Sequence, residues 1–360
     1  KLKNLTIVIP TFNRNKFLLR NLDFWENFQT NIIILDASKK KINSNVFSKY
    51  KNDIFYFYEK NLSFEKRLYI GSKKILTKYC ILLGDDEIIN PWFLKKGIKF
   101  LEKNNSFGCC IGRCVGFRKF HNHLYLWPEK QIQANHQVNQ KNYLNRAKYH
   151  LSNFTPSSLY GLHTKKSFQF STHLFNKFNF SSPYVQETIF ELLSSFFGKG
   201  KVFKDFFWFR SFENYPINNQ SNPRLYSFPN WWNDKKNKKQ KEKLLSELVK
   251  SLNAKFSNKK INIYKFLKII LEKKASRDYL SKQELRDRFN KNYMDSLKKK
   301  LSYLKQIIKY IFINLNFGNF CFYRSKHSHN YSLLKESKIN YKLKEINYIN
   351  SFLINYEIKN

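Results

Sequence analysis

The chain has 360 residues, which is long enough for two or three domains. Hydrophobic residues make up 42% of it and aromatic residues 18%, and this composition excludes a mostly disordered protein. Lys and Arg number 66 against 26 Asp and Glu, so the formal net charge is +40, and we expect the protein to attract polyanions such as nucleic acid, anionic membrane or phosphorylated substrates. Abundant Lys, Asn, Ile, Phe and Tyr are also what an AT-rich genome produces, so the charge alone does not indicate a nucleic-acid-binding role.

The cysteines favour reduced thiols. There are 5, an odd number, and no second pair at zinc-ligand spacing accompanies the group Cys109, Cys110 and Cys114. The most apolar late stretch, 307–322, is interrupted by Lys309 and several Asn residues and is too polar to span a membrane. Because no signal-peptide pattern opens the sequence, we expect a cytoplasmic protein that makes peripheral contact with the inner face of the membrane.

The first hundred residues alternate between short apolar runs and helix-length segments. The apolar runs are typical of strands and cover 5–10, 31–38, 53–59 and 79–87. Between them, the segments 15–28 and 63–76 have the length of helices. This alternation predicts an α/β fold with a mostly parallel central sheet and helices on both faces. In such sheets, ligands bind at the carboxyl ends of the strands.

The rest of the chain is predicted to be mixed and then helical. Residues 109–117 and 123–127 are typical of a hairpin, and 143–151 and 187–196 are typical of helices. From about residue 233 the chain becomes more basic. Apolar residues then recur every three to four positions, which predicts a Lys-rich helical C-terminal region with helices over 242–252, 263–274 and 294–311.

Three adjacent acidic residues, Asp85, Asp86 and Glu87, follow the apolar run CILLG. Two carboxylates separated by one residue on an extended segment can face the same way and give a hard divalent cation its oxygen ligands. Acidic residues also end many strands without any such role. Taken alone, the triplet leaves both interpretations open.

Polar residues also follow the earlier strands. The turn TFNR offers backbone amides and Arg14, and Asp36 ends the second strand, where a carboxylate can accept hydrogen bonds from a nucleobase or a ribose. Lys66 and Arg67 lie on the predicted helix that flanks this edge. Cations and an acid-bound metal are what a diphosphate requires. The chain has no G-x-G-x-x-G after a strand and no P-loop, which disfavours a dinucleotide enzyme or a P-loop kinase.

Four motifs occur in order over residues 4–115: TIVIPTFNR, LDAS, N-x-S-x-x-K-R-x-x-x-G and LLGDDE. Together they resemble the nucleotide-sugar-binding half of a family 2 glycosyltransferase with the GT-A fold. The resemblance implies an inverting transfer of a sugar from a nucleoside-diphosphate donor, with Mg²⁺ or Mn²⁺ bound. We expect a GT-A domain over 1–230, with nucleotide-sugar binding in 1–115 and the acceptor side in 116–230, followed by the helical region 231–360.

The resemblance also assigns roles to single residues. It implies that the nucleotide sugar is bound by Pro10, Thr11, Arg14, Asp36, Arg67, Asp85, Asp86 and Arg210. The segment FFWFR, with Trp208 and Arg210, resembles one that closes over the diphosphate, and its alternative is a core aromatic cluster with a surface Arg. Asp85 and Glu87 are the implied metal ligands, although the motif leaves open whether Asp86 or Glu87 is the main one. His163 is a further candidate metal ligand, but a lone His is more often structural.

An inverting transfer needs a general base that removes the proton of the acceptor hydroxyl. Similar enzymes place an acid at the start of a helix well after the metal motif, and Glu187 in SPYVQETIFE occupies that position. Glu191, one turn later on the same face, is the alternative base. The structural alternative for Glu187 is an ordinary helix-capping carboxylate.

Three functions compete. The first is a glycosyltransferase of bacterial surface polysaccharide or glycan biosynthesis, which takes a nucleoside-diphosphate sugar and a glycan or lipid-linked acceptor and binds no specific nucleic acid. The second is a nucleotidyltransferase, which the missing Gly-rich phosphate loop disfavours. The third is a non-enzymatic protein that binds nucleic acid or membrane on a degenerate glycosyltransferase scaffold, and only the net charge supports it. We expect the first.

Overall fold

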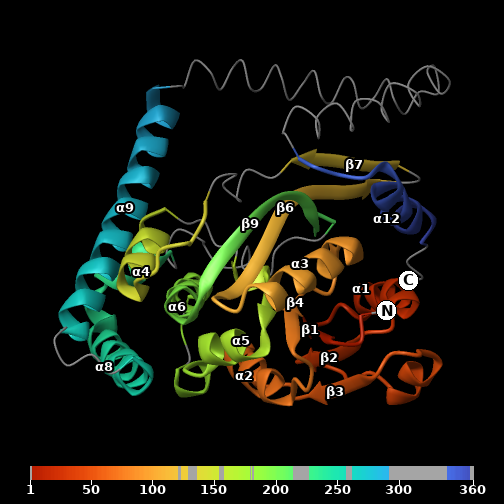
Figure 1. Ribbon diagram of the computed structural model, residues 1–360, viewed down its shortest axis with the longest axis horizontal. Coiled ribbons are helices and arrows are strands. Elements are labelled where there is room, and N and C mark those ends of the chain that lie inside the picture. Colours follow the sequence, from red (N-terminus) through yellow and green to blue (C-terminus); the bar gives the residue numbers. More distant parts are fainter. Residues whose placement is uncertain are drawn as a thin grey trace.

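The computed structural model describes residues 2–120, 123–128, 136–153, 158–178, 180, 182–213, 227–256, 262–291 and 339–356. The predicted helix over 294–311, the apolar stretch 307–322 and Cys321 lie outside the described residues. Within the described ranges the architecture is α/β, with one mixed sheet between layers of helices (Figure 1).

The four predicted N-terminal strands are confirmed and pair in parallel. Their bounds are β1 (Leu5–Thr11), β2 (Asn31–Asp36), β3 (Ile54–Tyr58) and β4 (Tyr79–Leu82). β1 lies between β2 and β4, and β2 lies between β1 and β3. Because side chains alternate between the two faces of a strand, both faces of β1 and β2 need cover, and their near-continuous apolar runs supply side chains to both.

Different helices cover the two faces of this sheet. The first face carries Ile7 and Ile32, which share a core with α1 (Asn15–Trp25) and α3 (Pro91–Lys103). The second face carries Val8 and Ile33, which share a core with three other helices, namely α2 (Phe64–Lys74), α5 (Lys165–Thr172) and α6 (Pro183–Phe197). Short 3-10 turns lie at η1 (Glu26–Phe28), η2 (Ser44–Lys49) and η4 (Phe175–Lys177).

The remaining strands turn the sheet into a mixed one. They are β5 (Ile88–Ile89), β6 (Phe107–Phe120), β7 (His123–Pro128), β8 (Leu162–Thr164) and β9 (Lys199–Ser211), and the order across the sheet is β3-β2-β1-β4-β8-β6-β9-β5, with β7 beside β6. β6 and β7 form the predicted hairpin. β9 runs parallel to β6 but antiparallel to β5. The GT-A-type fold is therefore confirmed. All pairings among β1, β2, β3 and β4 are parallel, whereas the later strands pair in both directions.

A second core lies beside α6. It is formed by α4 (Tyr143–Asn153), α6, α7 (Phe228–Asn233), α8 (Lys238–Lys255) and α9 (Ile263–Lys291), and the short turn η6 (Lys235–Asn237) leads into α8. Trp231 and Trp232 are buried in this core. The predicted helices 143–151, 242–252 and 263–274 lie within α4, α8 and α9.

The end of the described chain returns to the first core. Helix α12 (Leu343–Asn355) lies next to β7 and α1 in Figure 1, and the ring of its Phe352 lies 5.1 Å from that of Phe24 on α1. Its Ile346 and Leu353 are fully buried. The residues after 230 therefore contribute to both cores, and the predicted domain division at residue 230 stays a prediction.

The cysteines within the described residues agree with the expectation of free thiols. Cys80, Cys109, Cys110 and Cys114 are all buried and free. Among the helices within the described ranges, none combines the length and the apolar character needed to cross a membrane.

Candidate active site

The acidic triplet lies in a turn between β4 and β5, and a buried asparagine holds its backbone. The side-chain amide of Asn21, on α1, donates hydrogen bonds to the carbonyl oxygens of Gly84, Asp85 and Glu87 at 3.1, 3.2 and 2.7 Å. Arg20, the preceding residue, donates from Nη2 to the carbonyl oxygen of Asp86 at 2.9 Å. Helix α1 thus fixes the path of the turn that carries the carboxylates.

Replacing Asn21 with Ala is expected to leave three carbonyl oxygens without their donor, lower the free energy of unfolding by about 1–3 kcal/mol and weaken nucleotide binding. The matched control is Asn52→Ala, because buried Asn52 also donates to two carbonyl oxygens, those of Trp25 and Thr30, away from the triplet. Chemical denaturation and nucleotide titration of both variants measure the two effects. Equal loss of nucleotide affinity in both variants would refute a specific role for Asn21.

Asp85 and Asp86 converge on one cationic atom. Nη1 of Arg14 lies 3.4 Å from Oδ1 of Asp85 and 3.4 Å from Oδ2 of Asp86. Thr11 donates from Oγ1 to the second oxygen of Asp85 at 2.7 Å. Burial, with the charge of Asp86, nevertheless raises the pKa of Asp85 to about 7. Protein groups therefore neutralise this cluster only in part.

Glu87 joins the triplet to β9. Trp208, on β9, donates from Nε1 to Oε2 of Glu87 at 3.1 Å, and the guanidinium carbon of Arg210 lies 5.8 Å from the centre of the Trp208 ring. Burial and the charge of Asp86 raise the pKa of Glu87 to about 8, while Arg210 opposes the rise. The structure thus brings the FFWFR segment to the acidic turn.

The donor set around Arg14 fits a divalent cation. The two carboxylates of Asp85 and Asp86 already face one positive atom, and Glu87 follows them in the same turn. Within the described part of the chain, no group of three or more His, Cys, Asp or Glu side chains is arranged to hold a metal ion. One or two carboxylates together with substrate phosphates are the usual ligands of Mg²⁺. The chemistry of the residues is therefore compatible with Mg²⁺ or Mn²⁺.

Asp36 ends β2, and Arg67 reaches the same edge of the sheet from α2. Protein groups already bond most of the polar atoms of both side chains. Asp36 is fully buried and accepts hydrogen bonds from the Tyr56 hydroxyl at 2.7 Å and the Ser38 amide at 2.8 Å. Arg67 donates to carbonyl oxygens at the ends of β1 and β2, those of Thr11 and Leu35. Burial lowers the pKa of Arg67 to about 10, and the charge of Asp36 opposes that change. Both residues fix the geometry of this edge.

Glu187 lies in the second turn of α6, which begins four residues earlier than predicted, at Pro183. Its side chain is half-buried, and none of the described residues donates a hydrogen bond to its carboxylate. Burial, with the charge of Glu191, raises the pKa of Glu187 to about 7, while Arg210 and Lys274 oppose the rise. Because the N-cap of α6 is Ser182, Glu187 does not cap the helix.

Glu191 is engaged instead. It is fully buried and accepts hydrogen bonds from the imidazole of His150 at 2.7 Å and from the amides of Ser158 and Leu159 at 2.7 and 3.2 Å. The hydroxyl of Ser158 donates to it as well. Because these groups already bond its carboxylate, Glu191 fits the role of general base less well than Glu187 does.

The structure does not bring His163 to the acidic turn. The side chain is fully buried on β8, its Nε2 donates to the carbonyl oxygen of Ser158 at 2.5 Å, and its Nδ1 lies 3.5 Å from Oγ of Ser167. Burial lowers the pKa of His163 to about 4, and the acid that acts on it is Glu191. Both ring nitrogens thus face protein partners, which fits a structural histidine better than a metal ligand.

Two residues of the site were not predicted from the sequence. Asn21 gave no signal because a lone Asn within a helical segment has no recognisable spacing. Tyr160 ends η3 (Ser158–Tyr160), and its ring stacks on Trp208 with centres 4.8 Å apart and planes inclined by 23°. The charges of Glu187 and Glu87 both act on its hydroxyl. Its only signal was its place in SLYGLHTKK, the segment noted for His163.

A model of glycosyl transferase family 2 matches residues 6–159, the segment that carries the strand ends and the acidic turn. The match covers 154 of the 360 residues of the chain. No curated protein matches the sequence of the chain. The family match agrees with the resemblance of the four motifs to family 2 glycosyltransferases.

Solved structures of S. aureus TarS are similar to this chain at low identity. TarS 1-349 has a TM-score of 0.43 and 13% identity, and the match covers 58% of this chain and 60% of that one. The complex of TarS 1-349 with UDP-GlcNAc has a TM-score of 0.45 and 13% identity, with 70% and 73% covered. A third TarS structure is matched over 37% of its length, so the chain spans less than two thirds of two of the three. These likenesses are too distant to assign residues.

Proposed function

We propose that the protein transfers a sugar, with inversion and with help from a divalent metal ion, from a nucleoside-diphosphate donor to an acceptor hydroxyl. The observation that carries this proposal is the convergence of two groups at one end of the sheet. The acidic turn with Arg14 and Arg210 can bind a diphosphate, and the carboxylate of Glu187 accepts no hydrogen bond from the described residues. Arg210 acts electrostatically on both Glu87 and Glu187.

The side chains divide the work of the transfer. Arg14 and Arg210 stabilise negative charge on the departing diphosphate. A metal ion held by Asp85 and by Asp86 or Glu87 would add Lewis-acid stabilisation of the same charge. Glu187 in its ionised form accepts the proton of the acceptor hydroxyl. A raised pKa near the working pH makes this carboxylate a stronger base than an exposed one.

The nucleoside end of the donor is proposed to lie beside Pro10, Thr11, Asp36 and Arg67. Support comes from the place of Pro10, Thr11 and Asp36 at the carboxyl ends of parallel strands, where ligands of such sheets bind. Arg67, on α2, donates to carbonyl oxygens at these strand ends. Because Asp36 is already bonded to Tyr56 and Ser38, base recognition would require a group that shares or replaces the Tyr56 hydroxyl. UDP-sugars are the first donors to test.

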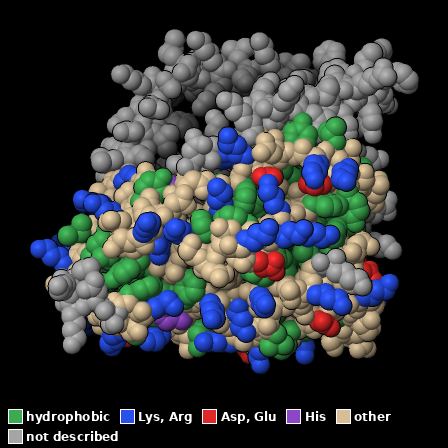
Figure 2. Space-filling view, viewed as in Figure 1, with side chains coloured by type: hydrophobic (Ala, Val, Ile, Leu, Met, Phe, Trp, Pro, Cys, Tyr) green, Lys and Arg blue, Asp and Glu red, His purple; other side chains and the backbone are tan. Residues whose placement is uncertain are grey.

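The acceptor is proposed to be a glycan or a lipid-linked glycan, and the protein is proposed to be cytoplasmic and peripheral to the membrane. Support comes from charge: Lys and Arg side chains are spread over the face in Figure 2 with few acidic residues between them. Such a surface attracts anionic lipid or phosphorylated acceptors. The pathway of surface polysaccharide or glycan synthesis is part of the same proposal.

A nucleotide panel tests the donor site. The melting temperature is measured with UDP, GDP, CDP, TDP and ADP, each with and without Mn²⁺, and donor turnover is followed by release of the nucleoside diphosphate. We expect one nucleotide to stabilise the protein in a Mn²⁺-dependent way, by about 2.7 kcal/mol at a hundred times its Kd. Equal shifts with every nucleotide and with inorganic polyphosphate, all removed by salt, would favour a polyanion-binding protein instead.

A further inference from the structure

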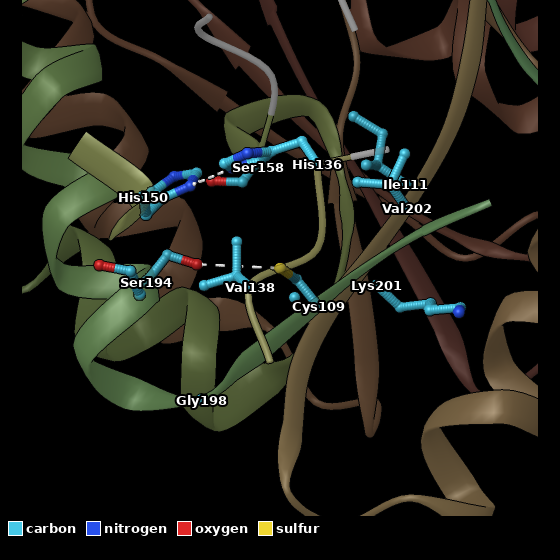
Figure 3. Close-up of a pocket in the computed structure, with 12 residues that line it drawn as sticks. Cys109, Ile111, His136, Val138, His150, Ser158, Ser194, Gly198, Lys201 and Val202 are labelled. Atoms are coloured by element: carbon cyan, nitrogen blue, oxygen red, sulfur yellow. Dashed lines mark hydrogen bonds between the residues drawn. The ribbon is translucent and has the colours of Figure 1, made fainter. Parts of the chain in front are cut away.

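A buried network surrounds Glu191, away from the reacting groups. Its Oε2 accepts from His150, whose Nδ1 lies 2.8 Å from Nε2 of His136. Figure 3 shows His136, His150 and Ser158 grouped on one side of a pocket. An ionised Glu191 makes His150 the donor at Nε2, so His136 donates to His150. The buried Nδ1 of His136 is left with no hydrogen-bond partner among the described residues.

The network fixes one short turn, η3, from both sides. Glu191 accepts the amides of Ser158 and Leu159 together with the Ser158 hydroxyl. On the opposite side, His163 donates to the carbonyl oxygen of Ser158, which also accepts the amide of Gly161 at 2.8 Å. Five hydrogen bonds thus hold this turn from its two sides.

The last residue of this turn interacts with both parts of the proposed active site. The ring of Tyr160 stacks on Trp208, which donates to Glu87, and the charge of Glu187 also acts on the Tyr160 hydroxyl. The hydroxyl has no hydrogen-bond partner among the described residues. Among acids it can only donate, so it suits an oxygen of a bound sugar or diphosphate.

We propose that Glu191 is a positioning residue, which holds η3 so that Tyr160 stays stacked on Trp208 and donates a hydrogen bond to the substrate between Glu87 and Glu187. This inference rests on the proposed transfer of a sugar at that site. Glu191 itself touches no substrate. A misplacement of about 1 Å in an active site lowers turnover on the order of 100-fold.

The test is a double-mutant cycle with Glu191→Gln and Tyr160→Leu. Glutamine keeps one acceptor oxygen but places an amide against the donors of His150 and Ser158. Each single variant is expected to lower kcat on the order of 100-fold. Because both act through the same ring, the double variant is expected to lose no more than either one. Additive losses, on the order of 10⁴-fold, would overturn the proposal.

A second readout does not depend on activity. The emission of Trp208, which is 3% exposed, is obtained as the difference between each protein and its Trp208→Phe counterpart. Both Glu191→Gln and Tyr160→Leu are expected to expose the indole and shift this emission to longer wavelength. Ser195→Ala is the matched control, since Ser195 is buried on the same helix and its hydroxyl donates to the carbonyl oxygen of Leu192, away from Glu191. It is expected to change neither emission nor kcat.

The two readouts separate the proposals. If the wild-type protein transfers no sugar, the proposed function fails, while the Trp208 shift still tests whether Glu191 holds the turn. If sugar is transferred and Glu191→Gln keeps wild-type kcat and emission, the positioning role is overturned and the function stands. Should Glu191→Gln not fold, Ser158→Ala removes a single bond to Glu191 and is measured in its place.

Discussion

Replacing Glu187 with Gln is expected to lower kcat by about 10²–10⁴-fold, the usual contribution of a general base. The affinity for the nucleoside diphosphate is expected to stay within about twofold, because the diphosphate is proposed to meet Arg14 and Arg210 rather than Glu187. Steady-state kinetics and nucleotide titration of the same preparation measure both quantities. A loss of nucleotide binding as large as the loss of turnover would contradict the role of Glu187 as base.

The pH dependence of the wild-type protein should report the same carboxylate. Burial and Glu191 raise the pKa of Glu187 to about 7, and only the ionised form accepts a proton. The value of kcat/KM is therefore expected to fall as the pH drops through about 7. Glu187→Gln should lose the part of this dependence that Glu187 causes and keep the part due to Asp85 and Glu87, whose pKa values burial raises to about 7 and about 8. A rate that is flat between pH 5 and pH 7 would exclude Glu187 as the base.

The matched control for Glu187→Gln is Glu247→Gln. It removes the same charge from α8, where Glu247 pairs with Lys177 and Lys250 on the surface. Surface ion pairs contribute about 0–1 kcal/mol, so this variant is expected to keep both wild-type stability and wild-type turnover. A large loss of turnover in Glu247→Gln would mean that the net charge, rather than Glu187, governs the rate.

The N-terminal half of the fold could be predicted because its signals are local. Each buried parallel strand is a short apolar run, and β1, β2, β3 and β4 begin and end within a few residues of the predicted bounds. β9 was missed for the opposite reason. Its run of Phe and Trp has no periodicity that separates strand from helix, and its pairing with β6 joins residues about a hundred positions apart.

The site residues also divide into those with a local signal in the sequence and those whose role depends on distant contacts. The triplet and Arg14 were found because they follow strands directly, and the structure brings them together. His163 looked like a metal ligand because a sequence shows no partners, and its bond to Ser158 appears only in three dimensions. The same holds for Asn21, whose three acceptors lie more than sixty residues away along the chain.

Asp85→Asn is expected to abolish the Mn²⁺-dependent shift and to lower kcat/KM by about 10²–10³-fold, while it raises the stability of the unliganded protein at pH 8. Asparagine keeps an acceptor for Thr11 Oγ1 and removes a charge that burial and Asp86 disfavour. Arg14 retains Asp86 as a partner. We expect the melting temperature at pH 8 to rise on the order of 2–4 °C.

The sign of this effect follows from proton linkage. The pKa of Asp85 is raised from 3.8 to about 7 in the folded protein, so between these values the folded state binds more protons than the unfolded state. The contribution of Asp85 to stability is then highest below about pH 4 and is lost as the pH rises through 7. Asp85→Asn should flatten this part of the profile, and Glu87, with a pKa of about 8, should keep a residual slope.

A matched substitution separates the site from the general effect of a lost charge. Asp205→Asn removes a carboxylate that pairs with Lys96 at 2.6 Å on the surface, and it is expected to change neither the pH profile nor the Mn²⁺ dependence. If Asp85→Asn were less stable than the wild type at pH 8, the carboxylate would be satisfied by Thr11 and Arg14 alone. If it still bound Mn²⁺ with the nucleotide, Asp86 and Glu87 would be the ligands. In that case, Asp86 and Glu87 alone would lower the stability of the unliganded protein and be neutralised when a cation and a diphosphate bind.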